Sequence, residues 1–168
     1  MFFASVLVWN LIGAGLFGFL INPPIALYYM QGLNMTATHA HAALFGVYGM
    51  LGLGLILFCM RGLTDPARWN NKLLRISFWS LNIGLAMMVF LSLAPQGLWQ
   101  TYISFTQDYA AARSAETIHS PVMQALVWAR VPGDIVFGIG ALAFAAFAVQ
   151  AFSQRRKASG ETMERPTA

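Results

Sequence analysis

Two histidines stand two positions apart, in the string Thr38-His39-Ala40-His41-Ala42, where a long apolar segment begins. A neutral imidazole binds transition metals and is an axial ligand of haem iron in many proteins. Side chains two apart on a helix point about 200° from one another, so this pair is poorly placed to chelate one ion. Each histidine is instead able to bind its own group, on opposite faces of one helix with room left by the alanines. The competing interpretation is two interfacial polar residues bonded to solvent or neighbours, although ionisable residues within membrane spans are functional candidates by default.

Composition places the helix that carries this pair in a membrane protein. Of the 168 residues, 58% are hydrophobic and 10% are charged, against about 25% charged residues in a typical soluble domain. Apolar runs long enough to cross a bilayer recur along the chain. The net charge of +4 does not indicate nucleic-acid binding, because the basic residues lie in loops beside apolar segments, where they report topology. Cys59 is the single cysteine, so an internal disulfide is excluded.

The pattern predicts an all-α membrane protein with four transmembrane helices. The expected spans are residues 2–21, 38–59, 76–93 and 134–153. Prolines end the first span at Pro23-Pro24 and the third at Pro95, since proline cannot continue a helix. Residues 121–130 are expected to form a helix that projects beyond the bilayer, with a kink at Pro132-Gly133.

Loop charges predict the orientation. The loop 61–75 and the tail after residue 153 each carry four basic residues, whereas the segment 94–119 carries only Arg113. Basic residues mark the cytoplasmic side of an inner membrane, so both termini are predicted to be cytoplasmic. Residues 1–153 are then expected to form one transmembrane helical segment that carries the histidine pair, and the polar tail 154–168 is predicted to be disordered. The N-terminus has no basic region and no small-residue cleavage site, and it is interpreted as the first span.

Small residues cluster on the first two spans. They are Gly13, Gly15 and Gly18 on the first, and Ala42, Gly46, Gly49 and Gly52 on the second. Spacings of three and four place the second set on one ridge. Two interpretations stay open for this ridge, namely close packing of another helix and close approach of a flat cofactor.

The histidine segment resembles a known family. Residues 33–49 (LNMTATHAHAALFGVYG) are similar to the histidine-bearing penultimate helices of nitric oxide reductases, in the haem–copper oxidase subunit I superfamily. The motif Asn22-Pro23-Pro24 and the string 130–134 (RVPGD) are also similar to that family. The likeness extends over about residues 2–152 and is closer to the single-chain, quinol-dependent type than to the cytochrome c-dependent type.

The resemblance implies two haem b groups on the second span. His39 would be the proximal ligand of the high-spin haem, and His41 one of two axial ligands of the low-spin haem. The enzyme would be an oxidoreductase of the bacterial inner membrane that reduces nitric oxide to nitrous oxide. Its implied electron donor is quinol rather than cytochrome c. Membrane lipid is a further expected partner.

The chain also departs from the family. The family's non-haem iron needs three more histidines and a glutamate, and the low-spin haem needs a second histidine, whereas only His119 remains here. The chain therefore resembles the last four helices of a catalytic subunit, and alone it is expected to be inactive. The missing ligands would come from N-terminal helices of the same enzyme or from a split partner chain. The alternatives are a small stand-alone haem-binding electron carrier and a cofactor-free helical scaffold.

Several other polar residues are candidates for roles near this site. Arg130 and Asp134 are spaced for an i, i+4 ion pair, or Arg130 binds haem propionates, for which a planar guanidinium is suited. His119 is interpreted as a surface residue, with a proton-path or quinol contact as the alternative. Asn10 and Asn82 are expected to form hydrogen bonds across helices.

Overall fold

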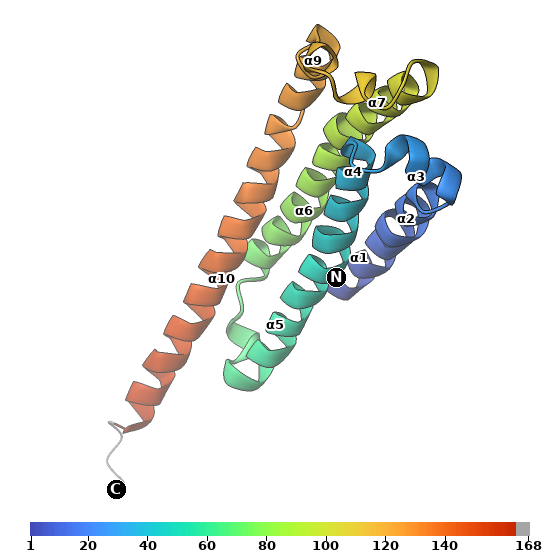
Figure 1. The fold of residues 1–168 in the computed structure, drawn as a ribbon. Coiled ribbons are helices and arrows are strands. Elements are labelled where there is room, and N and C mark those ends of the chain that lie inside the picture. The colour runs from blue at the N-terminus through green and yellow to red at the C-terminus, as the bar shows by residue number, and fades with distance from the viewer. Residues whose placement is uncertain (164–168) are drawn as a thin grey trace, which may run out of the picture.

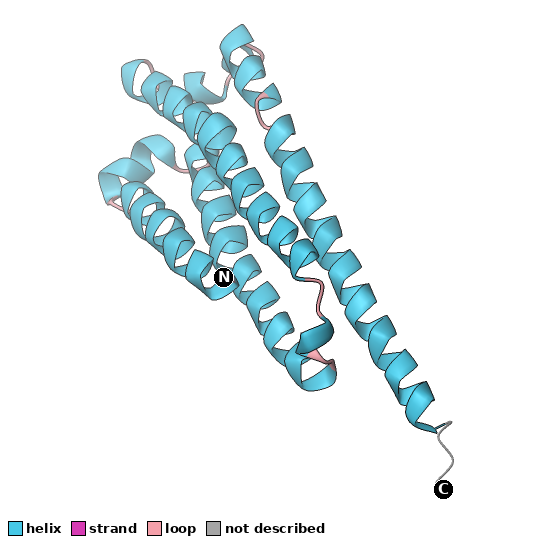
Figure 2. Ribbon diagram, turned by 180° about the vertical axis from the view of Figure 1, so that it is seen from behind, coloured by secondary structure: helices cyan, strands magenta, loops and turns pink. Residues whose placement is uncertain are grey.

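Four long helical spans make up most of this computed structural model (Figures 1 and 2). It describes the backbone of residues 1–163 and the side chains of residues 1–154. The four spans, each long and apolar enough to cross a membrane, are Phe2–Ile21, Asn34–Leu63, Asn71–Thr106 and Pro121–Gln154. Residues 1–163 contain no strand. The prediction of an all-α membrane protein with four transmembrane helices is confirmed.

Each span is built from consecutive helical elements. The first consists of α1 (Phe2–Trp9), η1 (Asn10–Phe17) and α2 (Gly18–Ile21), and the second of α4 (Asn34–Ala43), η2 (Leu44–Gly49) and α5 (Met50–Leu63). The third consists of α6 (Asn71–Met87), η4 (Met88–Leu93) and α7 (Ala94–Thr106), and the fourth of α9 (Pro121–Trp128) and α10 (Val131–Met163). The connections contain α3 (Pro24–Met30), η3 (Pro66–Arg68), η5 (Ala111–Arg113) and α8 (Ala115–Ile118). Within the first three spans, the elements η1, η2 and η4 are π-helical. The π-helix is a wider winding that frequently occurs at functional sites.

The third span contacts each of the other three. Its α6 lies along α10, and its α7 lies beside α4 at the end where the second span begins (Figure 1). Toward the first span, Asn82 accepts a hydrogen bond of 2.9 Å from the indole N–H of Trp9. The buried core between the spans includes Phe2, Trp9, Met50, Leu85 and Phe144. The connection through η3 and the C-terminal end of α10 lie at one end of the bundle, and the segments α7 to α9 lie at the other.

Large apolar side chains cover the outside of the bundle. Leu7, Leu11, Phe19, Phe58 and Leu142 each expose more than two thirds of their surface. Such exposure is costly in water but natural against lipid, which is as apolar as these side chains. The arrangement is that of a multi-pass membrane protein.

Two prolines act differently from the prediction. The third span continues through Pro95 to Thr106, because the π-helical winding of η4 directly before it loosens the backbone where a proline ring would clash with an α-helix. The interruption in the fourth span falls at residues 129–130, just before the predicted kink. Pro132 then lies in the first turn of α10, where a missing N–H costs nothing.

The C-terminal tail also differs from the prediction. Helix α10 continues to Met163, whereas the sequence predicted a disordered segment over 154–168. Residues 154–158 (QRRKA) are good helix formers, and no proline occurs between residue 154 and Pro166. Residues 164–168, including Arg165, lie outside the described residues.

Candidate functional site

The two histidines leave α4 on opposite sides. The chain enters this helix through Gly32, whose φ of +74° is the left-handed conformation that glycine adopts without strain. Helix α4 then runs through an alanine-rich stretch of good helix formers. The His39 ring packs against the first span, where it contacts Gly13. The His41 ring reaches Arg130, in the turn between α9 and α10 of the fourth span. The pair therefore faces two different environments.

A backbone carbonyl selects the tautomer of His39. Its Nδ1 lies 2.8 Å from the Gly13 carbonyl oxygen. Because a carbonyl only accepts, Nδ1 carries the proton in the neutral imidazole, and the lone pair is then on Nε2. A carbonyl bonded to the other ring nitrogen is the usual support of a metal-binding histidine, since it sets both tautomer and ring orientation.

Small residues on the first span allow that contact. A Cβ atom placed on Gly13 would lie 2.6 Å from the backbone carbon of Ala42, so the first two spans touch backbone to backbone here. A Cβ on Gly18 would lie 3.2 Å from Cε1 of His39. Both glycines thus make room for the imidazole and for the helix that carries it.

His41 is held in the same tautomer by its own helix. Its Nδ1 donates to the carbonyl of Ala37 at 2.9 Å, which leaves the Nε2 lone pair facing outward. The guanidinium Nη2 of Arg130 donates to that lone pair at 3.3 Å. Arg130 also pairs with Asp134, with 3.0 Å between Nε and Oδ1, so the expected i, i+4 ion pair is present. A cation therefore lies beside the one free nitrogen of His41.

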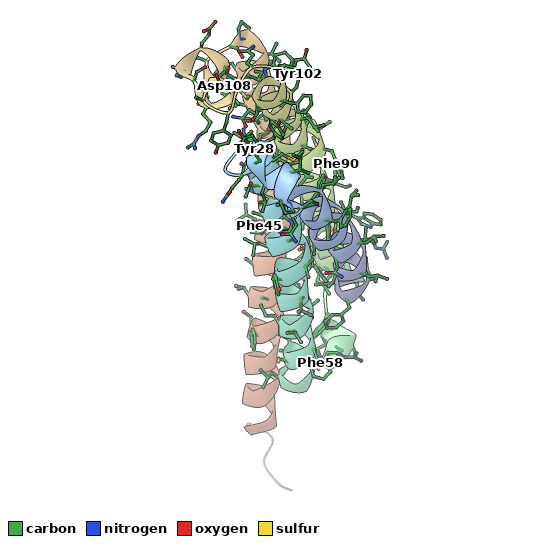
Figure 3. The ribbon with its side chains drawn as sticks, turned by 45° about the vertical axis from the view of Figure 1, so that its right-hand side comes forward. Tyr28, Phe45, Phe58, Phe90, Tyr102 and Asp108 are labelled. Carbon is green, nitrogen blue, oxygen red and sulfur yellow. The ribbon has the colours of Figure 1, made fainter. Side chains whose placement is uncertain are left out.

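An apolar crevice adjoins the His41 side. It has a volume of about 270 Å³ and lies between the second and fourth spans, lined by Phe45, Met50, Leu81 and Phe137 among others. Phe45 packs edge-on against Phe137 with ring centroids 5.4 Å apart. Figure 3 shows Phe45 on the side of the fourth span and Phe90 on the side of the first. Phe45 is also one turn beyond His41, with ring centroids 6.3 Å apart.

The donor chemistry of these residues is compatible with one axial haem ligand on each side of the helix. In the neutral Nδ1–H tautomer each imidazole presents an Nε2 lone pair, and that of His41 accepts from Arg130 in this structure. Apolar walls suit the macrocycle, and the Arg130 guanidinium suits a haem carboxylate. Each histidine supplies one ligand only, and among the side chains that the structure describes (residues 1–154) no three His, Cys, Asp or Glu residues gather as a metal site.

The other predicted residues have mixed outcomes. Asn82 bonds to Trp9 of the first span, so its predicted cross-helix hydrogen bond is confirmed. Asn10 is exposed on the outer face of the first span, so its predicted cross-helix hydrogen bond is not formed within the described residues and stays a prediction for further helices. His119 lies exposed on the turn after α8.

The small-residue ridge on the second span serves packing at two of its positions. Ala42 meets Gly13, and a Cβ on Gly46 would lie 2.5 Å from the side chain of Trp9. Nothing lies within 4 Å of a Cβ on Gly52. The ridge is therefore a helix contact near the histidines and open space farther along.

A buried polar network beside the site was not predicted from the sequence. Asn34, in the first turn of α4, bonds to Gln96 and Gln100 of α7, and Gln96 bonds to Ser92. The signal was available, because Ser92, Gln96 and Gln100 recur every four residues within an otherwise apolar helix.

Comparisons with known proteins identify relatives of the chain. Residues 1–136 match the family described as cytochrome c and quinol oxidase polypeptide I. The chain is also 28% identical over 139 residues to a nitric oxide reductase subunit of Stutzerimonas stutzeri. That match covers 79% of this chain and 28% of the relative, so the chain spans little more than a quarter of that protein's length.

Proposed function

The chain belongs to the cytochrome c and quinol oxidase polypeptide I family, and from this membership we propose that it holds two haem groups in a nitric oxide reductase. The enzyme would reduce nitric oxide to nitrous oxide, as the name of its relative indicates. One observation carries the proposal. Both histidines donate Nδ1–H to a backbone carbonyl, so two Nε2 lone pairs leave one helix on opposite sides.

In this proposal the chain's residues hold and orient the cofactors. His39 Nε2 would hold the iron of a high-spin haem b, and His41 Nε2 that of a low-spin haem b. The haem groups, when bound, would supply the redox chemistry. The Arg130 guanidinium, on a side chain that is about one third exposed, would pair with a haem carboxylate.

The proposed enzyme needs more ligands than this chain provides. The low-spin haem requires a second axial ligand, and His119 lies exposed on a loop. We assign that ligand and the ligands of a non-haem iron to further helices, from the same polypeptide or a partner chain. Quinol is the proposed electron donor.

The proposed location is the bacterial inner membrane with both termini cytoplasmic. The end of α5, the loop through η3 and the start of α6 lie at the same end of the bundle as the C-terminal end of α10. They carry Arg61, Arg68, Lys72 and Arg75. The segments from α7 to α9 lie at the opposite end and contain few basic residues. This asymmetry supports the orientation.

The test substitutes each histidine in the complete enzyme that carries this chain. His39→Ala is expected to abolish the high-spin haem signal and leave the low-spin signal, and His41→Ala to do the reverse. His119→Ala, the matched control, is expected to leave both. Optical spectra and pyridine haemochrome content report the result. Identical spectra from all three variants, or equal loss of both signals from His39→Ala and His41→Ala, would refute the assignment of separate haems.

A further inference from the structure

A stripe of buried polar side chains runs along the third span beside the histidine-bearing helix. It consists of Ser92, Gln96, Gln100 and Ser104, which are 0%, 5%, 6% and 3% exposed. The spacing of four residues places neighbouring members next to one another on the helix surface. Gln96 and Gln100 reach α4. Buried amides are costly unless they are bonded, so this stripe has a structural purpose.

The stripe grips one residue of α4. Gln100 accepts from the backbone N–H of Asn34 at 2.9 Å, and Gln96 accepts from the Asn34 side-chain amide at 2.8 Å. Gln96 in turn donates to Ser92 at 2.8 Å, and Gln100 donates to the carbonyl of Ala112 at 3.2 Å. Asn34 is thus bonded to Gln96 and Gln100, and each of these glutamines is fixed by a further hydrogen bond of its own.

This grip replaces a local helix cap. The N-cap position of α4 is occupied by Leu33, which has no side-chain oxygen to accept from the first turn. Gln100 of another span accepts from that turn instead. The two backbones also touch, since a Cβ on Gly97 would lie 2.5 Å from the backbone nitrogen of Met35. The start of α4 therefore has one position relative to α7.

We propose that Asn34, Gln96 and Gln100 form an amide clamp that sets the rotation and depth of the histidine-bearing helix. A helix advances about 1.5 Å and turns about 100° with each residue, so a slip of one residue would carry both imidazoles to the wrong faces. His39 and His41 lie five and seven residues beyond the clamped position, within two turns. The three are positioning residues, and their relevance to haem rests on the proposed function.

The test combines a haem-independent distance with haem spectra, in the complete enzyme that contains this chain. Spin labels on the exposed native Cys59 of the second span and on Ser153→Cys of the fourth measure the position of the second span, with other cysteines replaced. Gln96→Leu and Gln100→Leu remove the clamp. Gln107→Leu, at the exposed end of α7, is the matched control.

Each clamp variant is expected to shift or broaden the label distance. The ratio of native to displaced helix positions should fall about three- to twentyfold, the range for one hydrogen bond between membrane helices. The high-spin and low-spin signals should decline together. Asn34→Ala, which removes the side-chain bond to Gln96 and leaves a good helix former, should shift the distance in the same sense. Unchanged helix content by circular dichroism guards against simple misfolding of the leucine variants.

The outcomes separate the two proposals. Distances in Gln96→Leu and Gln100→Leu equal to those in Gln107→Leu would overturn the clamp, whatever the haem content. A shifted distance in an enzyme whose spectra do not depend on His39 or His41 would support the clamp and refute the haem assignment.

Discussion

Replacing Gly13 with alanine tests how the first span supports His39. The added Cβ would lie 2.6 Å from the backbone carbon of Ala42, whereas ordinary contact begins at 3.4 Å, so the spans must separate by about 0.8 Å. Added to the 2.8 Å between His39 Nδ1 and the Gly13 oxygen, this gives about 3.6 Å, which is too long for a hydrogen bond. Loss of such a support weakens metal binding about 10- to 100-fold in other proteins.

The measurement is haem retention and the high-spin spectrum of the complete enzyme during washing with a competing haem-binding protein. Gly13→Ala should lose the His39-dependent signal about 10- to 100-fold faster than wild type, with the low-spin signal less affected. Gly52→Ala is the matched control, because nothing lies within 4 Å of its added Cβ. The control also corrects for the rise of about 1 kcal/mol in helix stability that any glycine-to-alanine substitution gives within a helix. Equal retention in both variants would refute the reasoning.

Three further substitutions have defined expectations. Arg130→Ala should alter the low-spin spectrum while the melting temperature stays nearly constant, because a half-exposed ion pair contributes only about 0–1 kcal/mol; a large loss of stability with an unchanged spectrum would contradict this. Asn82→Leu removes the hydrogen bond between the first and third spans and should lower the free energy of unfolding by about 0.6–1.7 kcal/mol, measured by denaturation in mixed micelles. Gly84→Ala would bring a Cβ within 2.5 Å of the Phe137 nitrogen and should lower the melting temperature, whereas Gly138→Ala, with nothing within 4 Å, should not.

Residue type and spacing predicted the main features of the fold and of the candidate site. Apolar runs predicted the four helices, since the bilayer demands long apolar segments whatever their partners. The spacing of two between His39 and His41 predicted opposite faces, which is a property of any helix. The spacing of Arg130 and Asp134 predicted their i, i+4 ion pair, which is present, while the binding of a haem carboxylate by Arg130 stays a prediction.

Features that depend on partners could not be predicted from local pattern. The bond from His39 to Gly13 depends on how closely two spans approach, and the sequence showed only small residues that permit such an approach. Pro95 was expected to end a helix because proline usually does so. The π-helical winding that lets the helix continue depends on tertiary packing, which the sequence does not show. Asn10 was expected to bond across helices, yet only the three-dimensional arrangement shows that it points outward.

The π-helical segments have a consequence for how this chain tolerates changes in length. A π-helical turn contains one residue more than the α-helical turn it replaces, so η1, η2 and η4 each contain extra residues for the length they span. Deletion of one residue within such a segment converts the π-helical turn into an α-helical one. The same deletion elsewhere rotates the following part of the helix by about 100°. In relatives, single-residue gaps in the alignment should therefore collect at these three segments.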